Sequence, residues 1–415
     1  MTLTTSPIFY FLQQEQIPCN FFSIYTTDIM NKLKDYLVKY RLELLFSIFL
    51  LCIFLIKHSF RYIITDDMKY YLLIWCDFIS HHEGISAYKY PFSNYTPLYT
   101  YILGLMIHFP VKWEIGIKVI SCFFDFVIAF YVYKIIKLKY SQAIWAYIAT
   151  GTVCILPTVL INGAMWGQCD SIYTAFVIMS LYYILKDQYS IAFIVYGIAL
   201  SLKIQAIFVA PFFIVLFLTN TRVKIKHVLS IFLVYLVTLI PALIAGRNFY
   251  ELLTIYINQA EGQNFILTFN SVSFYNFMPN TWASDLGNAG IFISVAITIL
   301  LVMVYTNKKN AQRENYIEFA FLCALIFPYF LPYMHERYYF MGDILAVVYV
   351  FYYRRHFYFL LLPFISFLTY LPYMFKIYTI DFKLLSFGIL LLLYLAIKNI
   401  VLEKIYSSPS KPNLE

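Results

Sequence analysis

The most regular feature of this sequence is a series of long apolar runs separated by short polar segments. A helix needs roughly 20 mainly apolar residues to cross a bilayer. The runs therefore predict about a dozen membrane-spanning helices. They lie at residues 42–62, 115–136, 142–161, 171–186, 190–202, 204–219, 226–246, 288–306, 317–333, 339–353, 356–374 and 384–402.

The composition supports the same class. Of the 415 residues, 62% are hydrophobic and 13% are charged, and the mean hydropathy is +0.72. Soluble domains are about 45–50% apolar and about 25% charged. These values exclude a soluble enzyme, a disordered chain and a disulfide scaffold, and they predict an all-α polytopic membrane protein. The net charge of +8 is typical of positive cytoplasmic loops, so we expect no nucleic-acid partner.

The positions of Lys and Arg predict the topology, because such residues gather in cytoplasmic loops. We expect a cytoplasmic N-terminal segment at 1–41, a membrane domain at 42–402 and a cytoplasmic tail at 403–415. This assignment requires that 97–136 makes one net crossing. The short run 97–109 is then interfacial. If 97–136 instead crosses the membrane twice, part of the predicted topology is reversed.

Five polar segments fall on the predicted non-cytoplasmic side. The first belongs to an outer loop at 63–114, in which we expect interfacial helices. The five segments lie at residues 63–96, 162–170, 203–204, 247–287 and 334–338. Because they are distant in sequence but share one face, they indicate a functional site.

The first segment holds two adjacent carboxylates, Asp66 and Asp67. A partly desolvated Asp binds a proton more tightly, and it can serve as a general base or a metal ligand. Adjacent acids just beyond a span are equally typical of a solvated helix start. The pair alone does not decide between these alternatives.

The next two segments carry Trp166, Gln168, Asp170 and Lys203. Trp can stack on a sugar ring, and Gln and Asp can bind hydroxyl groups, although an interfacial Trp and an N-cap Asp are alternatives. A lysine inside an apolar run costs about 2.5–3.5 kcal/mol on insertion scales. Lys203 therefore has either a phosphate partner or a structural partner such as Asp125.

The last two segments add further polar groups. His335, Glu336 and Arg337 are three consecutive ionisable residues between two apolar runs. Arg can grip a phosphate with two hydrogen bonds and His can donate one more, whereas a Glu336–Arg337 surface pair is the alternative. The 247–287 segment is rich in amides, which suits either a hydroxyl-bearing ligand or any exposed loop.

In this order, the motifs resemble those of the GT-C glycosyltransferases. The similarity is greatest to the bacterial relatives of the glycosylphosphatidylinositol- and dolichol-pathway mannosyl- and glucosyltransferases, and it spans roughly residues 60–340. The residues that carry it are Asp67, Tyr71, Trp75, Asp77 and Gly84, then Ser93-Asn94-Tyr95-Thr96-Pro97-Leu98-Tyr99, Trp166-Gly167-Gln168-Cys169-Asp170, Lys203-Ile204-Gln205 and His335-Glu336-Arg337-Tyr338.

The resemblance implies a GT-C-type bundle and a polyprenyl-phosphate sugar donor used at the periplasmic or luminal face. It implies that Asp67 is the catalytic base, a role that Asp66 can share. The Asp-x-Asp spacing of metal-dependent members is absent, because the acids here are adjacent. We therefore expect no obligatory cofactor and leave a divalent cation open.

Our hypothesis is an inverting hexosyltransferase of cell-envelope glycan synthesis. Lys203, His335 and Arg337 would bind the donor phosphate, and the acceptor would be a lipid-linked glycan or a polysaccharide within the membrane lipid. The residues that would bind the sugar or the acceptor are Trp75, Asp77, Asn94, Tyr95, Trp166, Gln168, Asp170, Gln205 and Glu336.

Two rival functions remain. One is a polymerase of O-antigen or capsule type that uses polyprenyl-diphosphate oligosaccharides, with which the long 247–287 segment is compatible. The other is a flippase for a lipid-linked sugar, although no inverted halves are visible. The Asn94-Tyr95-Thr96 sequon, followed by Pro97, lies at the predicted site. We therefore favour a bacterial inner membrane with a periplasmic site over the ER lumen. The sugar, the acceptor and the oligomeric state stay open.

Overall fold

The computed structural model describes residues 32, 34–82, 84–261, 266–307 and 310–406. The predicted N-terminal segment and C-terminal tail therefore lie mostly outside the described residues. The chain divides into two compact units, Met1–Cys52 and Ile53–Glu415. The second unit contains all the polar segments considered above.

The described part of the chain is almost entirely helical. Its first half contains α2 (Arg41–Ser59), η2 (Met68–Leu72), α3 (Leu73–His81), η3 (Gly84–Lys89), α4 (Pro97–Met106), α5 (Trp113–Lys139), α6 (Ala143–Ile155), α7 (Pro157–Ile161), η4 (Asn162–Trp166), α8 (Asp170–Leu185), α9 (Tyr189–Leu202), η5 (Ile204–Val209), α10 (Ala210–Thr219) and α11 (Ile225–Ile244).

The second half adds further helices and a pair of very short strands. These elements are α12 (Phe249–Glu261), β1 (Thr268–Phe269), η6 (Phe274–Phe277), η7 (Asn280–Trp282), α13 (Ala283–Thr306), η8 (Arg313–Asn315), α14 (Tyr316–Phe330), β2 (Met334–His335), η9 (Glu336–Tyr339), α15 (Phe340–Tyr353), η10 (Phe357–Leu360), α16 (Leu361–Leu368), α17 (Leu371–Phe375), α18 (Phe382–Ala396), η11 (Ile397–Val401) and α19 (Leu402–Tyr406).

All twelve predicted runs contain helix, but fewer helices than predicted are long enough to span a bilayer. Six described helices meet the length and hydropathy needed, and a seventh is obtained if the pair α6 and α7–η4, bent by 55°, counts as one span. The bend occurs at Pro157, which cannot continue the hydrogen-bond pattern of α6. The structure is that of an all-α polytopic membrane protein, with six or seven long apolar helices where the runs predicted about twelve.

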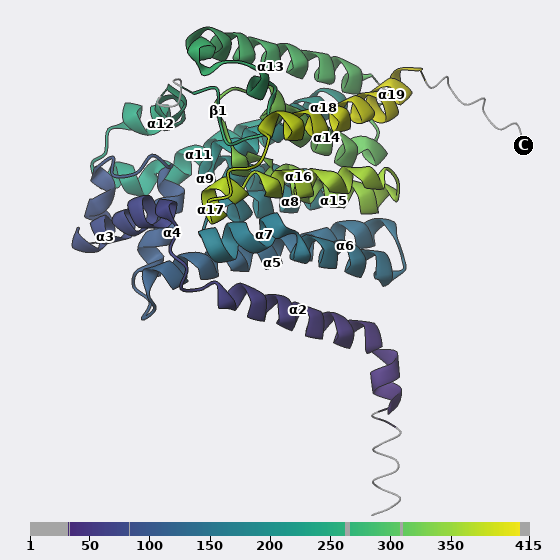
Figure 1. Ribbon diagram of the computed structural model, residues 1–415, viewed down its shortest axis with the longest axis horizontal. Coiled ribbons are helices and arrows are strands. Elements are labelled where there is room, and N and C mark those ends of the chain that lie inside the picture. Colours follow the sequence, from purple (N-terminus) through teal and green to yellow (C-terminus); the bar gives the residue numbers. More distant parts are fainter. Residues whose placement is uncertain (1–31, 33, 83, 262–265, 308–309, 407–415) are drawn as a thin grey trace, which may run out of the picture. The chain divides into compact units, whose positions relative to one another are not determined.

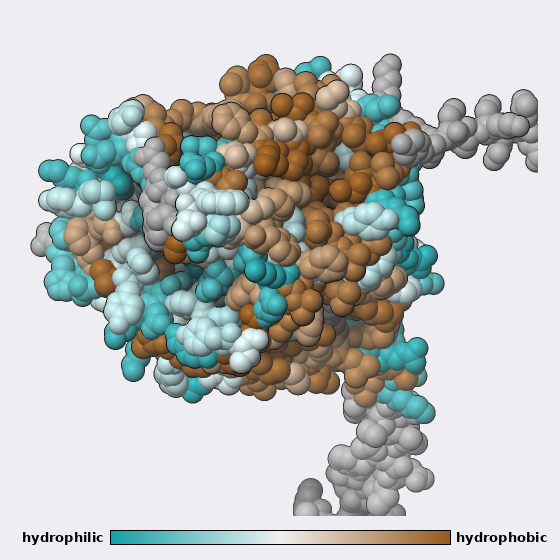
Figure 2. All heavy atoms as spheres, turned by 45° about the horizontal axis from the view of Figure 1, so that its top comes forward, coloured by the Kyte–Doolittle hydropathy of each residue, from teal (hydrophilic) through white to brown (hydrophobic). Residues whose placement is uncertain are grey.

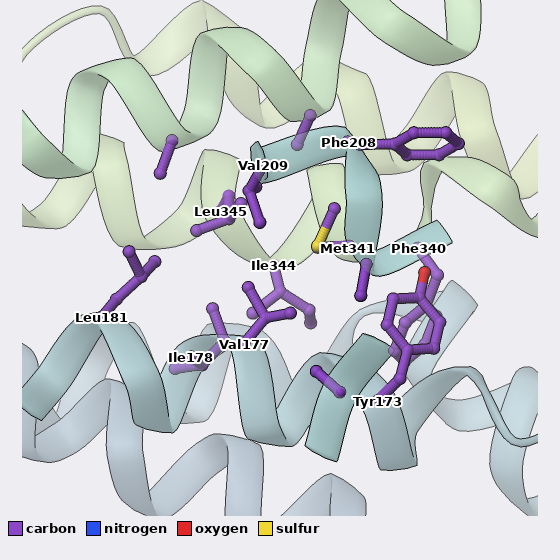
Figure 3. Packing of buried hydrophobic residues seen from close by; sticks show 14 of the residues in the cluster. Tyr173, Val177, Ile178, Leu181, Phe208, Val209, Phe340, Met341, Ile344 and Leu345 are labelled. Atoms are coloured by element: carbon purple, nitrogen blue, oxygen red, sulfur yellow. The ribbon is translucent and has the colours of Figure 1, made fainter. Parts of the chain in front are cut away.

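Helices α8 and α15 form the core of the second unit. α8 packs against α5 and α9, and α15 packs against α14, α16 and α6. Figure 3 shows the side chains of Ile344 and Leu345 turned towards Val177 and Leu181. All four are essentially inaccessible, and their van der Waals packing holds the helices together, since lipid tails are as apolar as these side chains.

The polar segments gather at one end of these helices. In Figure 1, α3, α4 and α12 lie at the left, towards the left ends of the roughly horizontal helices of the bundle. Figure 2 shows hydrophilic residues at the same end and hydrophobic residues over the neighbouring surface of the helices. The short parallel pairing of β1 with β2, which was not expected in an all-α chain, joins residues 268–269 to 334–335 at this end.

Candidate active site

A pocket of about 530 Å³ opens at the polar end, and all five predicted segments contribute to its wall. This volume is within the range of small-ligand sites. The predicted residues that line it are Asp67, Trp75, Asn94, Tyr95, Gln168, Gln205, His335, Glu336 and Arg337. Residues whose separation in sequence exceeds 250 positions therefore meet at one cavity.

Asp67 is a pocket carboxylate with polar contacts to both its side chain and its backbone. Its Oδ2 accepts hydrogen bonds from Trp166 Nε1 at 3.1 Å and from Gln168 Nε2 at 2.8 Å. Arg337 Nη1 lies 3.5 Å from the same oxygen. The backbone N–H of Asp67 donates to the Tyr373 hydroxyl at 2.7 Å. These contacts fix the orientation of a carboxylate that is still 23% exposed to the pocket.

The chain before Asp67 is anchored by a buried lysine. Lys118 Nζ, on α5, donates to the carbonyl of Phe60 at 2.7 Å and also to that of Ile63. Thr65 Oγ1 then donates to the carbonyl of Trp166 at 3.4 Å. The segment that leads to Asp67 is thereby tied to α5 and to the end of η4.

The two donors to Asp67 flank a glycine that no other residue can replace easily. Gly167 adopts φ +75°, which is favourable only without a Cβ. A Cβ at this position would also lie 2.4 Å from Met68 Cε. Trp166 ends the π-helical turn η4 and Met68 begins the π-helical turn η2. Such turns are rare and occur frequently at functional sites.

A second carboxylate, Asp170, lies beneath the pocket with three polar neighbours. Its Oδ1 accepts from Lys203 Nζ, and its Oδ2 accepts from Asn162 Nδ2 at 2.9 Å. Arg337 Nε lies 3.7 Å from Oδ2. Lys203 and Asp170 are both buried, and neither is among the residues that line the pocket. The predicted phosphate ligand Lys203 instead pairs with Asp170, while the acid considered as its partner, Asp125, pairs with Lys57.

Trp166 also differs from its predicted role. Its indole is completely buried, stacks on Tyr373 with ring centroids 4.6 Å apart, and meets Tyr370 edge-on at 5.4 Å. The ring has no face open to a sugar. Its N–H instead orients Asp67, so Trp166 supports the pocket wall from behind.

Two predicted acids lie away from the pocket. The Asp66 side chain is 61% exposed and pairs with Lys376 at 3.3 Å. The Asp77 side chain is 62% exposed and pairs with His81 at 3.5 Å. Asp66 and Asp67 are neighbours on the same helical turn and therefore point in different directions. Only Asp67 faces the cavity.

The third acid, Glu336, lines the pocket while its side chain is only 5% exposed. Burial raises the pKa of its carboxyl group to about 7, although Arg337 opposes this shift. His335 is stacked on Phe269 with ring centroids 4.5 Å apart. Burial, and then the charges of Arg337 and Lys203, hold the pKa of His335 well below its ordinary value. His335 is therefore a neutral hydrogen-bonding group at neutral pH.

Sequence reasoning missed Tyr373, Asn162 and Lys118. Tyr373 lies 306 residues from Asp67, and a Tyr among forty gives no local signal. Lys118 did offer one, because a lysine within an apolar run costs free energy unless it has partners. Asn162 lay in a segment that we singled out, but its contact with Asp170 was not foreseeable.

Comparison with curated proteins finds a distant likeness to a mannosyltransferase. No protein-family model matches the chain. A stretch of 126 residues is 26% identical to GPI mannosyltransferase 1 of Saccharomyces cerevisiae and covers 30% of this chain and 30% of that protein. The chain thus aligns with about a third of this relative's length. Because the likeness is weak and partial, it supports a membrane glycosyltransferase only in general terms.

Proposed function

We propose that this protein is an inverting, GT-C-type membrane glycosyltransferase. It transfers a hexose from polyprenyl phosphate to a hydroxyl group of a lipid-linked glycan or cell-envelope polysaccharide. One observation carries this proposal: the Asp67 carboxylate is oriented by two N–H donors and lies 3.5 Å from the Arg337 guanidinium, and both side chains line a pocket at the polar end of an apolar helical body. The distant likeness to a mannosyltransferase supports a sugar as the transferred group.

Asp67 would act as the general base. Its contacts with Trp166, Gln168 and Arg337 all fall on Oδ2, so we assign Oδ1 to take the proton of the acceptor hydroxyl. The acceptor oxygen attacks the anomeric carbon, and the bond from that carbon to the phosphate oxygen breaks. Its electron pair leaves with polyprenyl phosphate, and the anomeric configuration inverts. General-base assistance contributes typically about 10²–10⁴-fold.

Arg337 would stabilise the departing phosphate. The leaving group gains a negative charge, and a preorganised cation in a desolvated site stabilises such charge strongly. Arg337 presents several N–H groups, and its Nε is buried without a hydrogen-bond partner among the described residues. Lys203 and Asn162 hold Asp170 beside the guanidinium and so position it. His335 would donate one hydrogen bond as a neutral imidazole.

The remaining wall divides into a polar and an apolar part. Asn94, Gln205 and Asn270 line the pocket with amides that can bind sugar hydroxyls. Ile204, Ile207, Phe208, Ile291 and Leu331 line it with apolar groups. We propose that the apolar part takes the first isoprene units of the donor, since these hydrocarbon units match its apolar side chains.

We propose no obligatory metal, because the two adjacent acids are not arranged to chelate one. Asp66 points to Lys376 and Asp67 points into the pocket. We also propose that the pocket opens on the non-cytoplasmic side, in the periplasm of a bacterium or, as an alternative, in the ER lumen. Retention of activity in excess EDTA would support the first statement, and loss restored by a divalent cation would contradict it.

The experiment that tests the function uses purified protein in lipid nanodiscs. A panel of polyprenyl-phosphate sugars is supplied with extracted lipid-linked acceptors, and free polyprenyl phosphate and glycan mass are followed. We expect release with one donor, and a loss of about 10²–10⁴-fold in Asp67→Asn. Asp77→Asn, which changes an exposed acid in the same loop, is the matched control and should retain activity.

Two outcomes would overturn the proposal. Elongation of a polyprenyl-diphosphate oligosaccharide, without turnover of any monophosphate donor, would identify a polymerase. Movement of a labelled lipid-linked sugar between leaflets, without transfer, would identify a flippase.

A further inference from the structure

Helix α12 follows directly on α11, which is long and apolar enough to span a bilayer. Gly246, at φ +95°, turns the chain after α11. Asn248 Oδ1 then accepts the backbone N–H groups of Tyr250 and Glu251 at 2.8 and 3.3 Å. Such contacts are typical of a residue that caps the start of a helix. α12 lies at the left of Figure 1, at the polar end of the bundle.

α12 folds back against α11 and does not project away from it. The Tyr235 hydroxyl, on α11, donates to the carbonyl of Leu252 at 3.2 Å, and the ring centroids of Tyr235 and Tyr256 are 6.2 Å apart. Tyr235 lies nine residues before Ile244, the last residue of α11, which is about 14 Å along the helix axis. α12 therefore lies alongside the last turns of α11, near the depth at which that helix leaves the bilayer.

The side of α12 that faces the protein forms part of the pocket wall. Leu252 and Ile255 are buried, and their neighbours on this side, Tyr256 and Gln259, line the pocket. The Tyr256 hydroxyl donates to the carbonyl of Leu200, near the end of α9. The position of α12 thus determines the position of two pocket residues.

The side of α12 next to this one is apolar but exposed. Successive residues of a helix are about 100° apart, so the exposed large apolar residues of α12 fall within one sector of about 100°. They are Phe249, Tyr250, Leu253 and Ile257. The polar residues Glu251, Thr254 and Asn258 occupy the remaining side. α12 therefore has a pocket face, an exposed apolar face and a polar face.

This division is typical of a helix that lies in a membrane interface. The 13 residues of α12 are too few to span a bilayer, which takes about 20. A helix with separate apolar and polar faces lies in the interface plane, with its apolar face at the boundary of headgroups and acyl chains. Exposed apolar patches mark protein or membrane contacts. Phe232, Leu236 and Ile240 are exposed on α11, and the contact of α12 with this spanning helix favours lipid.

We propose that α12 is an interfacial helix whose apolar face, formed by Phe249, Tyr250, Leu253 and Ile257, docks into the lipid of the bilayer leaflet at which α11 ends. Its polar face is turned to water. Contact with lipid thereby holds the pocket face in place, so the bilayer positions one wall of the pocket. This inference does not rest on the sugar-transfer proposal, and its test needs no enzymatic assay.

The test measures the surroundings of spin labels by electron paramagnetic resonance in the full-length protein in lipid nanodiscs. Cysteines are introduced one at a time in a background in which Cys19, Cys52 and Cys122 are replaced by Ser. Each label is exposed to oxygen, which partitions into lipid, and to a nickel chelate, which stays in water. Labels at Leu253→Cys and Ile257→Cys should respond mainly to oxygen.

Two labelled positions serve as references. Phe130→Cys, at an exposed position of the long apolar helix α5, reports lipid, and Asn258→Cys, on the polar face of α12, should respond mainly to the nickel chelate. If the labels at 253 and 257 respond as the label at 258 does, the apolar face lies in water and the proposal is wrong. If they are shielded from both reagents, a second copy or another protein covers the face, which also overturns the proposal.

A label at Gln259→Cys tests the effect of lipid on the pocket wall. Its spectrum should be that of an immobilised label, and it should narrow when Leu253→Gln/Ile257→Gln weakens the contact with lipid. The matched control Thr254→Gln/Asn258→Gln changes the polar face and should leave the spectrum as it was, with melting curves to match the variants for folded protein. An unchanged spectrum in Leu253→Gln/Ile257→Gln would contradict the claim that the bilayer positions this wall.

Discussion

Lys57–Asp125 and Lys203–Asp170 are both buried lysine–aspartate pairs, yet their surroundings differ. Lys57 Nζ lies 2.7 Å from Asp125 Oδ2 and donates also to the carbonyl of Val159. This pair joins α2, α5 and α7, and neither residue lines the pocket that contains Asp67. The Lys203–Asp170 pair touches Arg337, which does line the pocket. The difference teaches that a buried ion pair suggests a functional site only when its contacts lead to a cavity, and otherwise has a structural explanation.

The largest expected effect comes from breaking each pair in turn. Lys203→Met and Lys57→Met should each destabilise the fold by about 3–5 kcal/mol, because each leaves an uncompensated buried carboxylate. Removal of both partners, in Lys203→Met/Asp170→Leu and in Lys57→Met/Asp125→Leu, should restore most of the stability. Denaturant unfolding measures this loss and recovery.

The two double variants should then differ in activity. The Lys57–Asp125 double variant should transfer sugar at a near-normal rate per folded molecule. The Lys203–Asp170 double variant should not, because Arg337 has lost the acid that positions it. Equal activity in the two double variants would contradict the claim that the Lys203–Asp170 pair supports transfer and the Lys57–Asp125 pair does not.

Substitution of the arginine that connects the second pair to the pocket should have the next largest effect. Arg337→Lys keeps the charge but loses the planar, bidentate geometry that suits a phosphate. We expect kcat to fall about 10²-fold, as on loss of one transition-state donor. Steady-state kinetics measure this, with Arg222→Lys, in a surface pair with Asp187, as the control. A change in KM alone would mean that Arg337 binds the donor without stabilising its departure.

A smaller effect should follow from Tyr373→Phe. The variant removes the oxygen that accepts the Asp67 backbone N–H at 2.7 Å, while it keeps the ring that stacks on Trp166. Without this hydrogen bond the Asp67 carboxylate is positioned less precisely, so we expect kcat to fall about tenfold, which is about 1.4 kcal/mol in the activation barrier. Tyr378→Phe, at an exposed position, should behave as wild type. An unchanged rate in Tyr373→Phe would show that the other contacts suffice to hold Asp67.

The smallest effect is a pH dependence from Glu336. Its pKa is raised to about 7 by burial, so the folded state holds this proton more tightly than the unfolded state does. The favourable contribution of Glu336 to stability is therefore complete below about pH 4.5 and is lost as the pH rises through about 7. The Tm of wild type minus that of Glu336→Gln should fall over this window. A difference that rises with pH would contradict the assigned direction.

The fold was largely predictable because its signals are local. Hydrophobic runs such as 115–136 and 226–246 correspond to the long helices α5 and α11. The number of spans was not predictable, since breaks such as the 55° bend after α6 shorten helices whose composition is that of a full span. The pairing of β1 with β2 depends on residues 66 positions apart and has no local signal.

The composition of the pocket was also predictable, but not the arrangement of its residues. Five polar segments on one side indicated a cavity, and the structure brings them together. Which of Asp66 and Asp67 faces it depends on Lys118 and Tyr373, which are remote in sequence. Trp166 and Asp170 are residue types that commonly bind sugars. Packing nevertheless buries both side chains behind the pocket wall.

The central claim is that Asp67, and not its neighbour Asp66, is the base. The most direct measurement is the rate of polyprenyl phosphate release by Asp67→Asn and Asp66→Asn under saturating donor, with both variants matched for folded protein by their thermal melting curves. The account predicts a loss of about 10²–10⁴-fold in Asp67→Asn and a near wild-type rate in Asp66→Asn. Full activity in Asp67→Asn together with an inactive Asp66→Asn would contradict it.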